Sequence, residues 1–249
     1  MEHQTILMIH GMQGGGWQWE NFKCFFEEKG YVCITPNLKY HARGEPHPML
    51  GTVSIKDYLD DLEVLLGSLP ENTILMGHSM GGLLALLLSA KGYGGQTVLF
   101  TPATPSGIWS ITPTVLKGFA TSILQWRFWR KPFKQTFKEA HHTVLKGLSD
   151  EDARMFYDYF SYESGQALFE IGLWFLDKKK TTRVDKKSLT HPILTIGGVK
   201  DNAIPIKSTR KMVQQYEMTY WEYPEHSHAI LGEKGWDAIA WRIQKWLTT

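Results

Sequence analysis

Short apolar runs alternate along the chain with longer stretches whose apolar positions repeat at helical spacing. The runs are apolar almost throughout, which is typical of strands that are covered on both faces of a sheet. The predicted strands are residues 5–10, 31–35, 73–77, 96–101, 192–197 and 218–223, and the predicted helices are residues 19–29, 54–68, 80–91, 206–215 and 236–247. Strands that alternate with helices predict an α/β fold, with a mostly parallel sheet of about six strands flanked by helices.

One interval breaks this alternation, because about 90 residues separate the strand predicted to end at 101 from the strand predicted to begin at 192. A structureless loop of that length is not expected in a compact domain. The interval is rich in aromatic residues and has helical spacing. We therefore interpret residues 103–187 as an inserted helical cap, or lid, on a core formed by residues 1–102 and 188–249. Its basic end, residues 177–187, is expected to be a solvated return linker rather than a ligand site.

Composition and charge narrow the class of protein. The 249 residues are 43% hydrophobic, which is enough for one sizeable core and excludes a disordered or fibrous protein. A net charge of +2 gives no general basic field, so nucleic acid is not an expected partner. No apolar run approaches the roughly 18 residues of a membrane span, and the N-terminus lacks the apolar region of a signal peptide. Cys24 and Cys33 fall in predicted core elements and are expected to be buried free thiols, as in a cytoplasmic protein.

The strongest chemical signal is the sequence Gly77-His78-Ser79-Met80-Gly81, which lies between a predicted strand and a predicted helix. It matches the nucleophile elbow Gly-x-Ser-x-Gly, in which glycines allow a sharp turn that exposes the serine hydroxyl. Ser79 is therefore the candidate nucleophile. Because a serine hydroxyl needs a general base that is itself oriented by a third group, the chain must also supply a histidine and an acid.

Both partners are available in loops that follow later predicted strands. Asp201 follows the strand 192–197, and ligands bind at that end of open parallel sheets. The alternative for Asp201 is only to cap the helix predicted to begin at 206. His226 and His228 follow the strand 218–223, and local reasoning does not choose between them. The order Ser, Asp, His is the order that the fold of the elbow requires.

The first predicted strand ends in His10-Gly11-Met12, followed by Gln13 and three glycines. One interpretation is a flexible turn. The other is an oxyanion hole, in which the backbone N–H groups of Met12 and Met80 face the charge that develops on an attacked carbonyl oxygen. The run lacks the Gly-x-Gly-x-x-Gly spacing of a dinucleotide site, which disfavours phosphate binding.

Together these residues resemble the α/β-hydrolase superfamily, specifically its small, lidded serine esterase and lysophospholipase-like members. The resemblance covers nearly the whole chain and rests on His10-Gly11 with Trp17, Pro36-Asn37-Leu38, residues 77–82, residues 197–201, His228 and the cap segment 163–168. It implies that the backbone N–H groups of Met12 and Met80 form the oxyanion hole.

The same resemblance implies a catalytic triad of Ser79, Asp201 and His228. In such proteins an acidic residue often follows the catalytic histidine by five positions, and Glu233 stands in that relation to His228. This favours His228 over His226 as the general base.

The aromatic cap implies an apolar cavity above Ser79, suited to an acyl chain or an aromatic ring. The candidate substrate-binding residues are Trp17, His78, Trp109 and Trp174. We therefore expect a serine hydrolase that cleaves a carboxylic ester of an apolar acyl or aromatic substrate through an acyl-enzyme. Thioesters, lactones and carbon–carbon bonds are within reach of the same groups, and a ligand-sensing binding protein is the alternative from another class.

Further expectations concern partners and cofactors. Trp126, Trp129, Phe133 and Phe137 recur at helical spacing beside basic residues, which leaves open a lid helix that touches anionic lipid, an ordinary lid, or a contact in a homodimer. Pro132 is expected to break or kink such a helix. No histidine or cysteine pair has metal-ligand spacing, so neither a metal nor another cofactor is expected.

Overall fold

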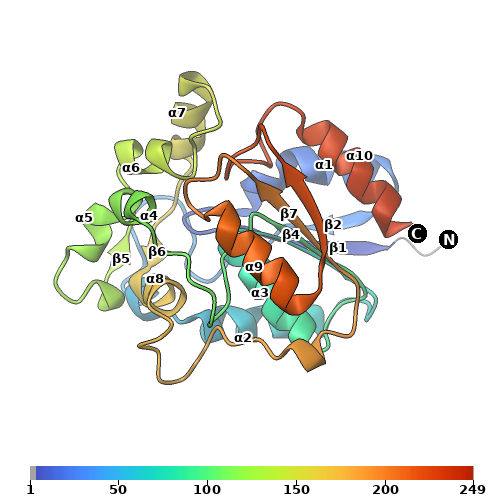
Figure 1. The fold of residues 1–249 in the computed structure, drawn as a ribbon, viewed down its shortest axis with the longest axis horizontal. Helices are drawn as coiled ribbons and strands as arrows, with labels where there is room; N and C mark the ends of the chain where they lie inside the picture. The colour runs from blue at the N-terminus through green and yellow to red at the C-terminus, as the bar shows by residue number, and fades with distance from the viewer. Residues whose placement is uncertain (1–3, 249) are drawn as a thin grey trace.

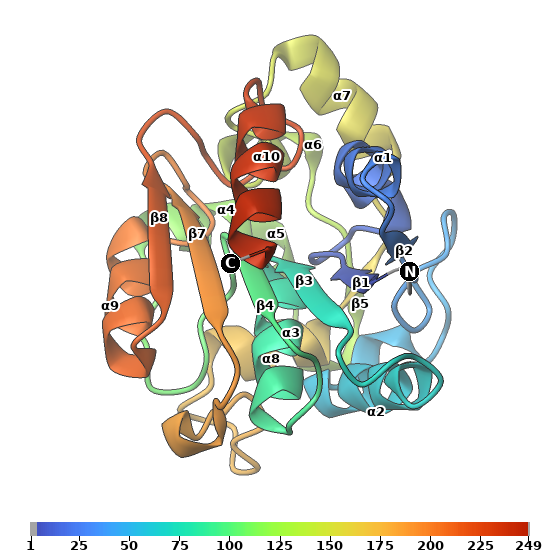
Figure 2. The same ribbon diagram turned by 90° about the vertical axis from the view of Figure 1, so that its right-hand side faces the viewer.

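A computed structural model describes residues 4–248, and its centre is a parallel sheet with the strand order β2-β1-β3-β4-β7-β8. Figure 2 shows the strands side by side in this order. Their bounds are β1 (Thr5–Ile9), β2 (Val32–Ile34), β3 (Ile74–His78), β4 (Thr97–Phe100), β7 (Ile193–Gly198) and β8 (Thr219–Tyr223). The predicted α/β fold is confirmed, and each of the six predicted strands is present with bounds that agree to within one residue.

Helices cover both faces of this sheet (Figures 1 and 2). In β1, Ile6 and Met8 pack into one apolar cluster while Leu7 and Ile9 pack into the other, because successive side chains of a strand point to opposite faces. The first cluster includes α1 (Glu20–Glu28) and α10 (Trp236–Leu247), and the second includes α2 (Ile55–Leu66), α3 (Met80–Ala90) and α9 (Ile206–Tyr216). None of the helices between residues 4 and 248 combines the length and the apolar composition that a membrane span requires.

The edges of the sheet depart from the prediction that every strand is covered on both faces. The residues of β8 are half-buried or exposed, and Val32 in β2 is 47% exposed. The prediction that both cysteines are buried is wrong for Cys24, which lies on an exposed position of α1. Cys33, in β2, is buried as predicted.

Between β4 and β7 the chain forms the region that we call the cap, residues 103–187, which lies to one side of the sheet (Figure 1). It consists of short elements, and β5 pairs with β6 in a small antiparallel sheet. The bounds of the cap elements are α4 (Pro113–Gly118), α5 (Ala120–Ile123), η3 (Phe128–Arg130), β5 (Pro132–Phe133), α6 (Phe137–His142), α7 (Asp150–Asp158), β6 (Glu163–Ser164) and α8 (Gly165–Gly172). The remaining short helices are η1 (Gly16–Trp19), η2 (Leu50–Thr52) and η4 (Lys186–Ser188).

The prediction of a single lid helix that includes Trp126, Trp129, Phe133 and Phe137 is wrong. Arg127 adopts a left-handed conformation with φ 56°, which the short helix η3 follows. Pro132, which has no N–H to donate within a helix, then begins β5. The helical spacing of the aromatic residues therefore does not place them on one face of one helix. A contact of the cap with anionic lipid and a contact of the cap in a homodimer stay predictions.

Candidate active site

Ser79 lies at the turn between β3 and α3, with backbone angles of φ 54° and ψ −119°. A Cβ atom at Gly77 would come within 2.2 Å of the Gly81 carbonyl oxygen, and one at Gly81 within 2.1 Å of the Ile9 carbonyl oxygen. Only glycine fits at these two positions. The Ser79 N–H donates to the carbonyl of Phe100 at 3.0 Å, which fixes the turn against the neighbouring strand. This is the sharp strand-to-helix turn that the sequence predicts.

His228 and Asp201 form a buried pair in the loops that follow β8 and β7. Nδ1 of His228 lies 2.8 Å from Oδ2 of Asp201, and each side chain is only 2% exposed. The other carboxylate oxygen accepts the N–H groups of Ala203 and Ile204 at 2.7 and 2.8 Å. Because Pro205 is the N-cap residue of α9, Asp201 is not the cap of that helix. Its carboxylate instead joins its own loop to the imidazole.

The loop that carries His228 is fixed by buried hydrogen bonds. The carbonyl oxygen of His228 accepts from Nε2 of His78 at 2.9 Å and from the Thr101 hydroxyl at 3.3 Å. Ser227 donates both its N–H and its hydroxyl to the Glu233 carboxylate. Burial, followed by the nearby His228, lowers the pKa of His78 to about 3, so the His78 ring is neutral at physiological pH.

His226, the other candidate base, lies in the same loop but is not among the residues that line the cavity. Its ring packs against Tyr223, and its Nε2 is buried without a hydrogen-bond partner among the described residues. His228, in contrast, lines the same cavity as Ser79. No hydrogen bond joins Ser79 to His228 within residues 4–248, and hydrogen bonds between catalytic groups often tighten only when substrate binds.

Two backbone N–H groups are candidates for an oxyanion hole. Met80 and Met12 both line the cavity that Ser79 faces. Met80 is the first residue of α3, where the N–H group has no acceptor within the helix. Met12 lies in the loop after β1, so the direction of its N–H depends on what holds that loop.

His10 holds one side of the loop. The Leu38 N–H donates to Nε2 of His10 at 2.9 Å, so Nδ1 carries the proton and donates to the Gly11 carbonyl at 2.8 Å. Burial, followed by the nearby His41, lowers the pKa of His10 to about 3 and keeps this tautomer neutral. Because N–H and C=O lie on opposite sides of a trans peptide, the bond to Gly11 directs the Met12 N–H away from His10.

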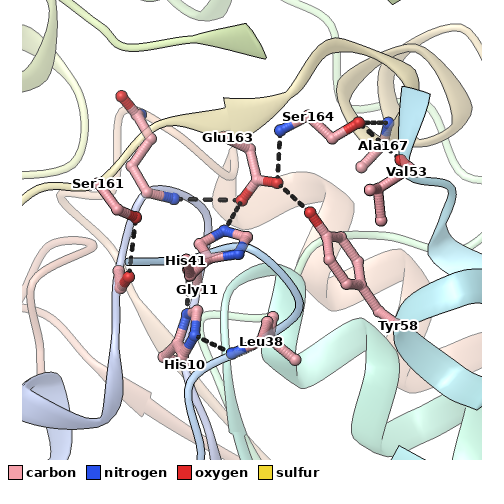
Figure 3. Close-up of polar contacts among 12 residues, drawn as sticks. His10, Gly11, Leu38, His41, Val53, Tyr58, Ser161, Glu163, Ser164 and Ala167 are labelled. Carbon is pink, nitrogen blue, oxygen red and sulfur yellow. Dashed lines mark hydrogen bonds and ion pairs between the residues drawn. The ribbon is translucent and has the colours of Figure 1, made fainter. Parts of the chain in front are cut away.

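A fully buried ion pair lies beside this loop (Figure 3). Oε2 of Glu163, from the cap, is 2.9 Å from Nε2 of His41, and Oε1 accepts the Tyr58 hydroxyl at 2.7 Å. Burial disfavours both charges, but the attraction between the two groups outweighs it, so the pKa of His41 is raised and the pKa of Glu163 is lowered. His41 and Tyr58 belong to no motif that the sequence reveals, and Glu163 stands out there only as part of the cap segment 163–168.

The cavity has a volume of about 380 Å³, within the range of small-molecule sites. Its lining contains no Asp, Glu, Lys or Arg among the described residues. The cap supplies most of its apolar wall, with side chains that include Ile111, Val115, Leu116, Phe119, Ile123, Phe128, Phe156, Phe160 and Leu168. Within residues 4–248, no group of three or more His, Cys, Asp or Glu side chains is placed to hold a metal ion.

Of the four predicted substrate-binding residues, only His78 is among the residues that line the cavity. Trp17 packs against aromatic rings of the cap. Trp109 stacks on Phe175 and is 53% exposed, and Trp174 also packs against Phe175. The structure therefore places these three tryptophans in contacts of the cap rather than at the cavity wall.

The chain is similar to known proteins in sequence and in fold. Residues 6–240 match the alpha/beta hydrolase family. Methylesterase 17 of Arabidopsis thaliana is 36% identical over 81 residues, which are 31% of this chain and 29% of that protein. Methylesterase 4 of the same organism is 36% identical over 90 residues, or 34% of each chain. The match thus spans about a third of the length of these curated relatives.

Solved structures resemble the chain over nearly its whole length. A methylesterase from Arabidopsis has a TM-score of 0.76 at 15% identity, with 99% of this chain and 100% of that chain covered. A pyrethroid hydrolase from Sphingobium faniae has a TM-score of 0.73 at 18% identity, with 98% and 97% covered. At such low identities the likeness shows the fold alone, and it confirms the fold expected from the sequence.

Replacing Ser79 by glycine is expected to give a more stable protein than replacing it by alanine. Neither variant has the hydroxyl, but a residue with a Cβ atom pays a strain of about 1–3 kcal/mol in this conformation. Glycine loses about 0.5–1 kcal/mol more chain entropy on folding than alanine, so about 0.5–2 kcal/mol of the difference remains. Ser79→Gly should therefore melt roughly 1–8 °C above Ser79→Ala in thermal unfolding followed by circular dichroism. An equal or lower melting temperature would contradict the strained turn.

The ion pair between His41 and Glu163 predicts a pH dependence of stability. Because the pKa of His41 is raised above its ordinary value of about 6.5, protonation of His41 stabilises the fold, and this stabilisation is complete below about pH 6.5. The stabilisation is lost as the pH rises through the raised pKa. The lowered pKa of Glu163 contributes above about pH 4.5 and is lost only in more acidic solution. The difference in unfolding free energy between the wild type and Glu163→Gln should thus be largest near pH 5–6.5 and shrink toward pH 9. Urea unfolding across this range measures it, and a constant difference would show that His41 is not charged.

Proposed function

Because the chain belongs to the alpha/beta hydrolase family, we propose that it is a serine hydrolase that cleaves carboxylic esters through Ser79, His228 and Asp201. One observation carries the proposal: Ser79, on its strained turn, lines an apolar cavity that is also lined by His228, which is paired with Asp201. A nucleophile, a base and an orienting acid are thus gathered at one place.

In the first step, His228 Nε2 takes the proton of the Ser79 hydroxyl as the Ser79 oxygen bonds to the carbonyl carbon of the ester. The carbonyl π electrons move to the oxygen, and the N–H groups of Met12 and Met80 stabilise that negative charge. Asp201, bonded to Nδ1, keeps the imidazole in the tautomer that leaves Nε2 free and stabilises the imidazolium that forms.

In the second step, the tetrahedral intermediate collapses, and its bond to the alcohol oxygen breaks. The departing alkoxide takes the proton from His228 and leaves as an alcohol, and the acyl group stays bonded to Ser79. A water molecule, deprotonated by His228, then attacks the acyl carbon, the bond to Ser79 breaks, and the proton returns to the Ser79 oxygen. The products are a carboxylic acid and the free enzyme.

The cavity supports a neutral, apolar acyl or aromatic substrate. No Asp, Glu, Lys or Arg among the described residues lines it, so a charged substrate would lose its hydration without gaining an ion pair with any of these side chains. The names of the relatives, two methylesterases and a pyrethroid hydrolase, support ester hydrolysis. Thioesters, lactones and carbon–carbon bonds remain substrates that the same residues could process.

The proposal is tested by release of p-nitrophenol from esters with acyl chains of increasing length. We expect kcat/KM to rise by roughly fourfold for each added CH2 group until the cavity is filled, since each buried CH2 contributes about 0.8 kcal/mol. Ser79→Ala should lower kcat by at least about 10³-fold, and His228→Gln by a similar factor. The matched control is Ser89→Ala, because Ser89 is a buried serine of α3 whose hydroxyl has no hydrogen-bond partner among the described residues.

Labelling with a fluorophosphonate separates the outcomes. Labelling of the wild type and of Ser89→Ala, but not of Ser79→Ala, together with turnover, supports the hydrolase. Labelling without turnover on any ester would favour the ligand-sensing protein. Absence of labelling in the wild type would contradict the role of Ser79 as a nucleophile.

A further inference from the structure

Gln13, the residue after Met12, is bound by the cap rather than by the core. It is 1% exposed and has φ 59°, a left-handed conformation that a residue with a side chain rarely adopts. Its N–H donates to Oε2 of Glu163 at 3.2 Å, and its carbonyl accepts the N–H of Ser161 at 2.9 Å. Its side-chain amide exchanges two hydrogen bonds with Gln135, at 2.6 and 2.9 Å. All four of these bonds lead to cap residues.

Glu163 is the centre of this contact (Figure 3). One carboxylate oxygen faces Gln13 and His41, and the other accepts the Tyr58 hydroxyl and the N–H of Ser164, both at 2.7 Å. The Glu163 side chain is fully buried, so its carboxylate depends on these protein donors rather than on solvent for its hydrogen bonds. Four donors thus converge on one carboxylate, which joins β6 of the cap to α2 and to the loop after β1.

The two peptide units that flank Met12 are anchored separately. The carbonyl oxygen of the Gly11–Met12 unit accepts a hydrogen bond from Nδ1 of His10, and the N–H of the Met12–Gln13 unit donates a hydrogen bond to Glu163. The Met12 N–H belongs to the first of these planar units, which the core holds through His10. The cap holds the second unit through Glu163, and the torsion angles at Met12 connect the two units. Release of the second unit would therefore let the first one turn, and with it the Met12 N–H.

We propose that Glu163 is a positioning residue for the oxyanion hole, which holds Gln13 in its left-handed conformation so that the Met12 N–H faces the reacting carbonyl. The inference rests on the proposed function, because it needs Ser79 to be the nucleophile. It gives the cap a part in catalysis that is separate from forming the wall of the cavity.

The cap contains a matched control. Glu170, on α8, is also a buried carboxylate, at 2% exposure, and it accepts a core N–H from Ile55 at 2.7 Å. Ile55 begins α2 and does not line the cavity. Substitution of Glu170 therefore removes a comparable bond between cap and core without touching the loop of Met12.

The experiment compares Glu163→Gln and Glu163→Met with Glu170→Gln and Glu170→Met. Glutamine keeps one acceptor oxygen in place of two, and methionine keeps the length of the side chain but no strong acceptor. For each variant, kcat and KM are measured with a p-nitrophenyl ester, together with the melting temperature and the inhibition constant of an alkyl boronic acid. The boronic acid forms a tetrahedral adduct on Ser79, so its affinity reports on the oxyanion hole.

We expect Glu163→Gln to lower kcat by about tenfold and Glu163→Met by about 100-fold or more, toward the loss seen when an oxyanion-hole donor is removed. The inhibition constant of the boronic acid should rise by the same factors, while KM changes less than about threefold, as for an interaction made only in the transition state. The Glu170 variants should keep kcat and the inhibition constant within about twofold, whatever their loss in melting temperature.

Two results would overturn the inference. One is a folded Glu163→Gln with wild-type kcat and boronic acid affinity. The other is an equal loss of kcat in the Glu163 and Glu170 variants, which would show a general loss of cap packing. If Glu163→Met does not fold, the comparison of Glu163→Gln with Glu170→Gln tests the inference. Failure of the proposed function is distinguishable, because the wild type would then show no turnover that depends on Ser79.

Discussion

The close approach of α3 to β1 is the constraint on which the rest of the site depends. At Gly81 the helix backbone is so near the Ile9 carbonyl that only a hydrogen atom fits between them. This contact holds the first turn of α3 at the end of the central strands and leaves Ser79 in a conformation that a side chain rarely adopts. The strain at Ser79 is maintained by the packing of a buried helix on a buried sheet, and not by any group in the site itself.

A parallel sheet then brings the other groups to the same place. The strands β1, β3, β7 and β8 run in one direction, so the loops that follow them meet at the C-terminal end of the sheet. These loops bring together four residues that are far apart in the sequence, namely Met12, Ser79, Asp201 and His228. The cap covers this end of the sheet and provides most of the apolar wall of the cavity. The core thus supplies Met12, Ser79, Asp201 and His228, and the cap supplies most of the side chains around them.

The strands and helices of the core could be predicted because their burial produces an apolar pattern that is local in the sequence. The elbow at Ser79 could be predicted for a similar reason, since its glycines are required by backbone contacts within a few residues and with one neighbouring strand. The local sequence does not predict whether Asp201 pairs with His228 or with His226, because both histidines lie in the same loop. The resemblance to known hydrolases favoured His228, and the structure places it beside Asp201.

The contacts of the cap could not be predicted in the same way. Its elements are short, and the partners of Glu163 come from three separate segments, which leaves no periodic signal in the sequence. The aromatic residues of the sequence indicate an apolar region but not which side chains face inward. Trp109 lies exposed, for example, while Phe119 lines the cavity.

The lining of the cavity contains no charged side chain among residues 4–248, and this bears on the release of the proposed product. In the proposed reaction a neutral ester becomes a carboxylate, whose negative charge gains no ion pair with a side chain of this lining and is better solvated in water. We therefore expect the cavity to hold the acid less tightly than the ester from which it forms.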